Sequence, residues 1–140
     1  MRFLIIIAVF LFHQIAFSEN LYDFKIIEVI DGDTLVIEAP YLPAPLKPEL
    51  KLRIVNVDTP EKGHRAQCES EKNQAAKAKE FVEQKINNGM VKKIRLDSWD
   101  KYGGRVLGDV IIDGQSLGDL LIQSNFAKSY QGGKKISWCP

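Results

Sequence analysis

Short runs of β-forming residues, interrupted by one segment of helical period, constrain the fold of this chain more than any other feature. Runs rich in β-branched and aromatic residues predict five strands, at 22–30, 34–38, 51–57, 91–96 and 105–112. Between the third and fourth runs, apolar residues recur at helical spacing and predict a helix over 69–87. This order predicts a mainly β, α+β fold, namely a small antiparallel OB-fold five-stranded barrel with two or three packed α-helices.

The connections between these elements carry their own signals. Asp31-Gly32-Asp33 predicts a tight turn between the first two strands, and the four prolines of 39–48 predict an extended loop. Asn88-Gly89 predicts the end of the long helix, and Asp113-Gly114 predicts a turn after the fifth strand. Ser116, with an acid three residues on, predicts the start of a short helix. We expect the polar, Gly-rich tail 131–140 to wrap the surface.

The first 18 residues have the composition of a secretory signal peptide. Arg2 precedes an apolar run over 3–12, and Ala16-Phe17-Ser18 supplies small residues near a cleavage point. The apolar run is short for a bilayer span, although an uncleaved membrane anchor is the alternative. We therefore expect a signal peptide at 1–18, a single domain at 19–140, and a secreted or periplasmic protein that meets a membrane only through the signal segment.

Charge argues against one class of function for the mature chain. The sequence has 19 basic and 18 acidic residues, and removing the signal peptide removes only Arg2, which leaves a net charge of about zero. A protein that coats nucleic acid through bulk charge is therefore disfavoured. Local basic clusters remain at 62–65, 92–95 and 134–135, and they allow a basic groove beside an acidic site.

Two cysteines, Cys68 and Cys139, lie in the mature chain. In an oxidising compartment an even count predicts a disulfide, with two free buried thiols or pairing between chains as alternatives. A zinc site has little support, because His64 is the only mature histidine and no CxxC is present.

Two acidic segments could hold a hard cation. Asp31 and Asp33 flank Gly32 after the first strand, and Asp58-Thr59 ends the third strand. Oxygen ligands favour Ca²⁺ or Mg²⁺ over zinc or copper. Asp33 and Asp58, with the backbone carbonyl of Thr59, would make an open cation site, and a carboxylate at Glu61 could deprotonate a nearby water.

Two arginines, Arg53 and Arg105, could grip a phosphate at the same place and stabilise charge in the transition state. Each segment also has an ordinary structural interpretation: Asp-Gly-Asp as a turn, Asp-Thr-Pro-Glu as a helix start, Arg53 as a solvated side chain, and 101–104 as a hairpin loop.

The spacing of Arg53 and Asp58 raises a parity problem, because side chains alternate between the two faces of a strand. Arg53 and Asp58 are five residues apart and lie on opposite faces of a regular strand, so a shared pocket requires a bulge between them.

Taken in order, three segments resemble the signatures of the thermonuclease family, also called staphylococcal-nuclease-like. They are 29–34, 53–61 and 100–105, and the likeness extends over roughly 25–130. The resemblance implies an OB-fold and Ca²⁺-dependent hydrolysis of DNA and RNA that leaves 3′-phosphate ends.

The resemblance also implies a role for each matching residue. Asp33 and Asp58 correspond to metal carboxylates, Thr59 to a carbonyl ligand and Asp31 to a supporting acid. Glu61 corresponds to the presumed general base, and Arg53 and Arg105 to the phosphate-gripping arginines. Lys101 and Tyr102 match positions that touch another phosphate of the nucleotide, and Tyr130 loosely matches an aromatic residue beneath the base.

The chain departs from the family pattern in two places. The third segment has two glycines, Gly103 and Gly104, where one is common, and we expect a bulge to keep Arg105 aimed at the site. The proline-rich insert lengthens the loop after the second strand.

These features predict a secreted, sugar-nonspecific, monomeric endonuclease that prefers single-stranded DNA and RNA and needs no stable protein partner. The alternatives are a noncatalytic OB-fold nucleic-acid-binding module and a structural Ca²⁺-binding surface protein. The first would be expected to lose acids and arginines that are present here, and the second has no use for Arg53 and Arg105.

Overall fold

A computed structural model describes residues 20–140. The predicted signal peptide at 1–18 lies outside the described residues. The elements, in chain order, are β1 (Leu21–Tyr22), β2 (Ile26–Val29), β3 (Thr34–Glu38), β4 (Glu49–Ile54), β5 (Val57–Asp58), the 3₁₀ turn η1 (Gly63–Arg65), α1 (Glu69–Asn88), β6 (Lys92–Trp99), β7 (Arg105–Ile112), β8 (Gln115–Ser116), α2 (Leu117–Gln123) and β9 (Lys128–Ser129).

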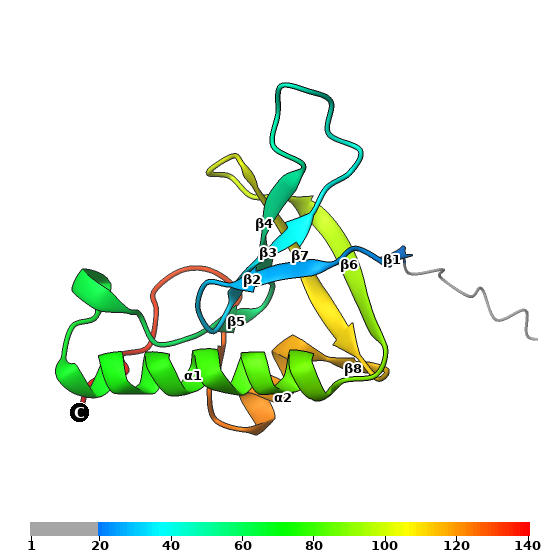
Figure 1. Cartoon of the computed structure of the whole chain (residues 1–140). Helices are drawn as coiled ribbons and strands as arrows, with labels where there is room; N and C mark the ends of the chain where they lie inside the picture. The colour runs from blue at the N-terminus through cyan, green and yellow to red at the C-terminus, as the bar shows by residue number, and fades with distance from the viewer. Residues whose placement is uncertain (1–19) are drawn as a thin grey trace, which may run out of the picture.

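The five predicted runs correspond to the five longer strands of one strongly coiled sheet (Figure 1), although the first run, 22–30, is broken between β1 and β2. The sheet has the order β1-β6-β7-β4-β3-β2, with β8 added beside β7, and β5 pairs separately with β9. This is the expected α+β, OB-like arrangement. The antiparallel pairing expected for the barrel does not hold at one place, because β4 and β7 pair in parallel. The chain passes through α1 and β6 between these two strands, and such a crossover is what parallel neighbours require.

Apolar side chains from both helices fill the inside of the coiled sheet. Alternate residues of β3 and β4 point inward, and Leu35, Ile37 and Leu52 are fully buried there. Val82 of α1 and Leu121 of α2 close the same core. Burial of this kind is the main favourable contribution to folding.

Helix α1 runs along one end of the barrel (Figure 1) and ends where the sequence predicted, but for a different reason. Gly89 has a φ of −69°, so it does not terminate the helix in the left-handed conformation. Instead, a Cβ at this position would lie 2.4 Å from Cγ2 of Ile112. The absence of a side chain therefore allows the helix end to pack against β7.

The turn and capping signals near the C-terminal helix are confirmed. Asp113 and Gly114 both have positive φ, at 49° and 82°, as a tight hairpin turn requires. The Ser116 side chain accepts a hydrogen bond from the backbone N–H of Asp119 at the start of α2. Asp109 of β7, for which the sequence predicted no role, accepts hydrogen bonds from Ser116 Oγ at 2.5 Å and from the Gly118 amide at 3.3 Å.

A break in the third predicted strand resolves the parity problem. Strand β4 stops at Ile54 and β5 begins at Val57, with Asn56 between them in the left-handed region at φ 61°. Arg53 reaches across this break and donates to the Val57 carbonyl at 3.2 Å. The two segments therefore do not keep strict alternation, so Arg53 and Asp58 need not lie on opposite faces of the sheet.

The loop 39–48 projects from the barrel beyond β3 and β4 (Figure 1) and contains no helix or strand. Among residues 20–140, no helix combines the length and apolar character needed to cross a membrane.

Candidate active site

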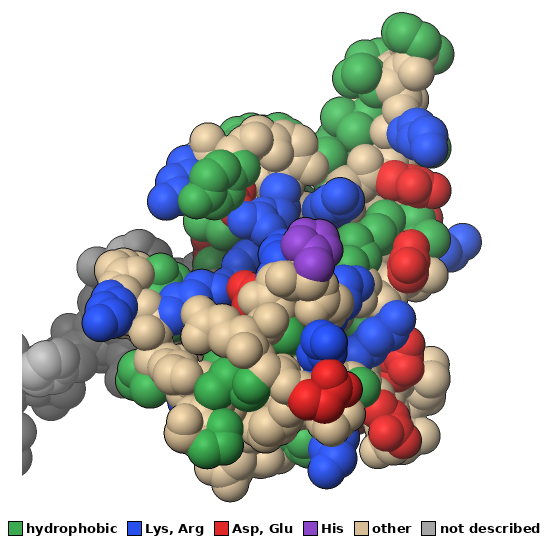
Figure 2. Space-filling view, turned by 90° about the vertical axis from the view of Figure 1, so that its left-hand side faces the viewer, with side chains coloured by type: hydrophobic (Ala, Val, Ile, Leu, Met, Phe, Trp, Pro, Cys, Tyr) green, Lys and Arg blue, Asp and Glu red, His purple; other side chains and the backbone are tan. Residues whose placement is uncertain are grey.

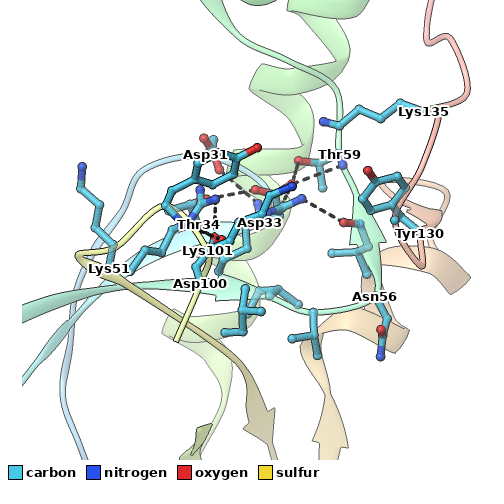
Figure 3. A pocket seen from close by; sticks show the side chains of 18 of the residues that line it. Asp31, Asp33, Thr34, Lys51, Asn56, Thr59, Asp100, Lys101, Tyr130 and Lys135 are labelled. Atoms are coloured by element: carbon cyan, nitrogen blue, oxygen red, sulfur yellow. Dashed lines mark hydrogen bonds and ion pairs between the residues drawn. The ribbon is translucent and has the colours of Figure 1, made fainter. Parts of the chain in front are cut away.

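A cleft of about 1010 Å³ lies where β4 and β7 meet the turns after β2 and β5. It brings together most of the residues predicted for the site: Asp31, Asp33, Arg53, Thr59, Glu61, Lys101, Tyr102, Arg105 and Tyr130. Four further charged residues, for which the sequence predicted no role, also line it: Lys51, Arg65, Asp100 and Lys135. Figure 3 shows Lys51 on one side of this cleft and Tyr130 and Lys135 on the other, with Asp31, Asp33 and Thr59 between them.

Asp33 is the acid at the centre of the cleft, and it is only 8% exposed. Its Oδ2 forms an ion pair with Arg53 and accepts from Thr59 Oγ1 at 2.8 Å. Its backbone carbonyl accepts from the Ile54 amide at 2.8 Å, which joins the Asp31-Gly32-Asp33 turn to β4. The turn can lie this close because Gly32 has no side chain. A Cβ at this position would come within 3.0 Å of side-chain atoms of α1 and of Thr59.

Asp31 supports Asp33 through the geometry of the turn. Its Oδ1 accepts from the Asp33 amide at 3.3 Å, and its Oδ2 lies 3.9 Å from Arg65. Burial, followed by the nearby Asp33 charge, raises the pKa of the Asp31 carboxyl above its ordinary value of 3.8.

Asp58 does not line the main cleft. It is 2% exposed and borders a second hollow, which shares Glu61, Arg65 and Lys135 with the first. Its Oδ1 lies 2.6 Å from Lys135 Nζ, and its Oδ2 accepts from Trp138 Nε1 at 3.2 Å. Neither contact was predicted, since both partners lie in the C-terminal tail, far from Asp58 in sequence.

Glu61 lies beside Asp58 at the edge of both hollows. Its carboxylate forms ion pairs with Arg65 at 3.2 Å and Lys135 at 2.9 Å. Its backbone amide donates to Oε1 of Glu71 at 3.1 Å, and Oε2 of the same buried carboxylate accepts from the Gln67 amide at 2.7 Å. Glu71, in the first turn of α1, therefore fixes both ends of the segment that carries Glu61.

Arg53 and Arg105 enter the cleft from adjacent parallel strands. Arg105 is the first residue of β7 and lies opposite Lys51 of β4, while Arg53 lies opposite Leu107. Gly103 and Gly104 before it both have positive φ, at 69° and 59°, and so absorb the extra residue within the hairpin loop. Arg105 remains in the cleft.

Asp100 holds the Arg105 guanidinium by two contacts. Nε of Arg105 lies 2.6 Å from Oδ2 of Asp100, and a terminal nitrogen lies 2.5 Å from the same oxygen. Although burial opposes the change, the hydrogen bond from Arg105 lowers the pKa of Asp100 below its ordinary value. The Tyr102 ring, 74% exposed, lies under Lys101 at 5.0 Å and under Arg105 at 5.8 Å.

The cleft is more basic than the chain as a whole. Six cationic side chains line it against four acidic ones, although the full chain has a formal net charge of only +1. Figure 2 shows Lys and Arg side chains gathered on one face of the molecule. A polyanion is therefore attracted to this cleft without a large net charge elsewhere.

The residues present fit a hard cation. Asp33 and Asp58 supply carboxylate oxygens and Thr59 a carbonyl; Thr59 Oγ1 donates to Asp33 at 2.8 Å, and Asp58 directly precedes Thr59 in the chain. A guanidinium already pairs with Asp33 and an ammonium with Asp58, so both carboxylates favour positive charge where they stand. A group formed by Cys68, Glu71 and Cys139 does not fit a metal, because the two sulfurs are joined in a disulfide.

The disulfide has a Cα–Cα distance of 6.0 Å and joins the residue before α1 to the end of the chain. Residues 131–140 therefore return to the start of α1, and Figure 1 shows the C-terminus beside that end of the helix.

Comparison with known proteins agrees with this geometry. The family model described as staphylococcal nuclease homologue matches residues 51–137. The chain is also 31% identical over 119 residues to the protein named Endonuclease YhcR of Bacillus subtilis (strain 168), a match that covers 81% of this chain. The chain spans only 9% of the length of that relative. With a family model matched over more than half its length, the chain belongs to the staphylococcal nuclease homologue family.

Proposed function

We propose that this protein is a secreted, Ca²⁺-dependent, sugar-nonspecific endonuclease that hydrolyses phosphodiester bonds of DNA and RNA and leaves 3′-phosphate ends. One observation carries the proposal: Arg53, Arg105 and Glu61 line the same basic cleft as the carboxylate of Asp33. The family, and a relative whose printed name is an endonuclease, support nuclease chemistry in this cleft.

In this proposal the arginines bind the scissile phosphate. The Arg53 guanidinium contacts the Asp33 carboxylate and the Val57 carbonyl, and the Arg105 guanidinium contacts the Asp100 carboxylate. A guanidinium has five N–H donors, so each retains donors for phosphate oxygens. Because the carboxylates already orient both side chains, less entropy is lost when the substrate binds, and the charge that develops in the transition state meets fixed donors.

Glu61 would accept a proton from the attacking water. The water oxygen forms a bond to phosphorus, in line with the P–O5′ bond that breaks, and the released 5′ oxygen takes up a proton. Asp33, Asp58 and the Thr59 carbonyl would hold Ca²⁺, with Asp31 in support. When bound, this ion supplies fixed positive charge against the phosphate oxygens.

The remaining side chains of the cleft suit a flexible, single-stranded substrate. Lys51, Lys101 and Tyr102 would contact flanking phosphates, and Tyr130 would present its ring to a base. Stacking on tyrosine tolerates any base, which fits action on both DNA and RNA. We further propose secretion through the signal peptide at 1–18 and function as a monomer.

The test is cleavage of single-stranded DNA and RNA by the purified protein, with Ca²⁺ or with a chelator. Arg53→Ala and Glu61→Gln should each lower the rate by at least about a hundredfold, the scale expected for loss of one transition-state donor or one general base. Glu83→Gln, the same change on α1 outside the cleft, should cleave at the wild-type rate.

The alternatives give different results in the same assay. A noncatalytic binding module would retain the oligonucleotide without cutting it, and a structural Ca²⁺-binding protein would neither cut nor bind it. Wild-type cleavage that is indifferent to chelation, or near-normal cleavage by Glu61→Gln, would refute the assigned chemistry. Analysis of the product ends tests the 3′-phosphate.

A further inference from the structure

The C-terminal tail lies on the acids that are proposed to hold the metal. Lys135 Nζ is 2.6 Å from Asp58 Oδ1 and 2.9 Å from Glu61 Oε1, so one ammonium bridges two carboxylates. Trp138 Nε1 donates to the other oxygen of Asp58 at 3.2 Å. Both carboxylate oxygens of Asp58 are therefore engaged by one short segment of chain.

Several contacts fix the tail on either side of Lys135. Downstream, Cys139 is bonded to Cys68, and Lys128 Nζ donates to the Ser137 carbonyl at 2.6 Å and lies 4.3 Å from the centre of the Trp138 ring. Upstream, the Tyr130 hydroxyl donates to the Gly133 carbonyl at 3.0 Å. Lys135 is therefore held over Asp58 by the fold and does not merely reach it from a free end.

The position of the ammonium matters because Asp58 is nearly inaccessible. Asp58 is 2% exposed, while Lys135 borders both the main cleft and the second hollow through which Asp58 is reached. A cation approaching Asp58 from either hollow meets an ammonium of the same sign. The lysine side chain is itself 42% exposed, so its head can move into water without burying its charge.

We propose that Lys135 is an internal competitor for the divalent cation at Asp58, and that it sets the cation affinity of the site. The inference depends on the metal site of the proposed function. Binding of a divalent cation to Asp58 requires the ammonium to leave Oδ1. The free energy of the lost Lys135–Asp58 ion pair therefore reduces the net free energy of cation binding. When the site holds no divalent cation, the same ammonium offsets part of the repulsion between two adjacent carboxylates and so stabilises the folded state.

The experiment measures Ca²⁺ affinity by titration calorimetry and thermal stability in a chelator, both independent of catalysis. For Lys135→Met we expect Ca²⁺ to bind roughly tenfold more tightly, which corresponds to about 1.4 kcal/mol. We also expect a lower Tm in the chelator, because buried Asp58 loses its partner. Lys134→Met removes the same charge one residue earlier, from a side chain that also borders the second hollow but forms no ion pair among residues 20–140, and should leave both quantities close to wild type.

The opposite signs of the two effects separate competition from a general structural role. A purely structural lysine would lower both the Tm and the Ca²⁺ affinity when replaced, and that result would overturn the inference. An equal gain in Ca²⁺ affinity in Lys134→Met would also overturn it. That result would mean that the loss of any nearby positive charge raises the affinity, and not the loss of the direct contact with Asp58. If wild type and both variants bind no Ca²⁺, the proposed metal site fails and the inference fails with it, whereas unchanged affinity in Lys135→Met alone refutes only the competitor.

Discussion

Replacing Glu71 should both destabilise the protein and slow hydrolysis, although Glu71 does not line the main cleft. Its side chain is buried, with 4% of the residue exposed, and its two oxygens accept from the Glu61 and Gln67 amides at 3.1 and 2.7 Å. It also lies in the first turn of α1, where a carboxylate interacts favourably with the helix dipole. One side chain thus anchors both ends of the segment that carries the proposed base.

The magnitude follows from these two bonds. A hydrogen bond to a charged group contributes about 1.5–3 kcal/mol, and Glu71→Ala removes two of them. Gln67 is exposed, so water can replace part of what its amide loses. We therefore expect Glu71→Ala to lower the free energy of unfolding by about 3 kcal/mol, near the bottom of the range. Glu71→Gln keeps one acceptor and should lose about half as much.

Urea unfolding, followed by tryptophan fluorescence, measures this change. The matched control is Glu69→Ala in the same helical turn, whose side chain is 75% exposed and pairs only with Lys72 among the described residues. An exposed pair of this kind contributes at most about 1 kcal/mol. At a temperature where every variant is folded, Glu71→Ala should lower kcat more than it raises KM, because the position of Glu61 is disturbed and the phosphate grip is not. If Glu71→Ala unfolds within about 0.5 kcal/mol of wild type, the anchoring role is refuted.

Three further changes test other parts of the fold. Gly32→Ala places a methyl group within 3.0 Å of an α1 side chain and should cost about 1–3 kcal/mol in urea unfolding; an unchanged midpoint would show that the turn can move away. Reducing the Cys68–Cys139 disulfide, which spans 71 residues, should cost about 4 kcal/mol on the chain-entropy estimate, and mass measurement without reductant checks that the bond exists in solution. Burial raises the pKa of Asp109 above 3.8, with the hydrogen bond from Ser116 opposing it, so the folded state binds its proton more tightly than the unfolded chain. Stability should therefore fall as pH rises from 3.8 through the raised pKa, and Asp109→Asn should remove that part of the slope, whereas an identical pH profile would contradict the assignment.

Local patterns predicted those features of the fold that depend on neighbouring residues. The alternation in 34–38 and the helical spacing of Ala75, Ala78 and Val82 each reflect one face that must be buried, and the structure has a strand and a helix there. The cap at Ser116 is equally local. The parallel pairing of β4 with β7 is not a local feature, because it depends on the path that the chain takes through α1 and β6.

The residues of the candidate site likewise fall into those that local sequence identifies and those that only the fold brings together. Asp33, Arg53 and Arg105 were identifiable because each lies at the end of a strand run within a short recognisable segment. The partners of Asp58 were not, since Lys135 and Trp138 lie about 80 residues away and are brought back by the disulfide. The pair of lysines at 134–135 was visible as a basic cluster, but nothing in the sequence distinguishes the one that contacts Asp58.

The cleft has a consistent electrostatic design that emerges only when these contacts are combined. Arg53 pairs with Asp33, Arg105 with Asp100, and Lys135 with Asp58. In each pair the carboxylate is the more buried partner, with side-chain exposures of 12%, 7% and 3% against 15%, 27% and 42% for the cations. The acids are therefore fixed by the fold, while the cations become progressively easier to move from Arg53 to Lys135. This order matches the roles inferred for them, since a guanidinium that grips phosphate must keep its orientation, whereas an ammonium that yields to a divalent cation must be able to leave.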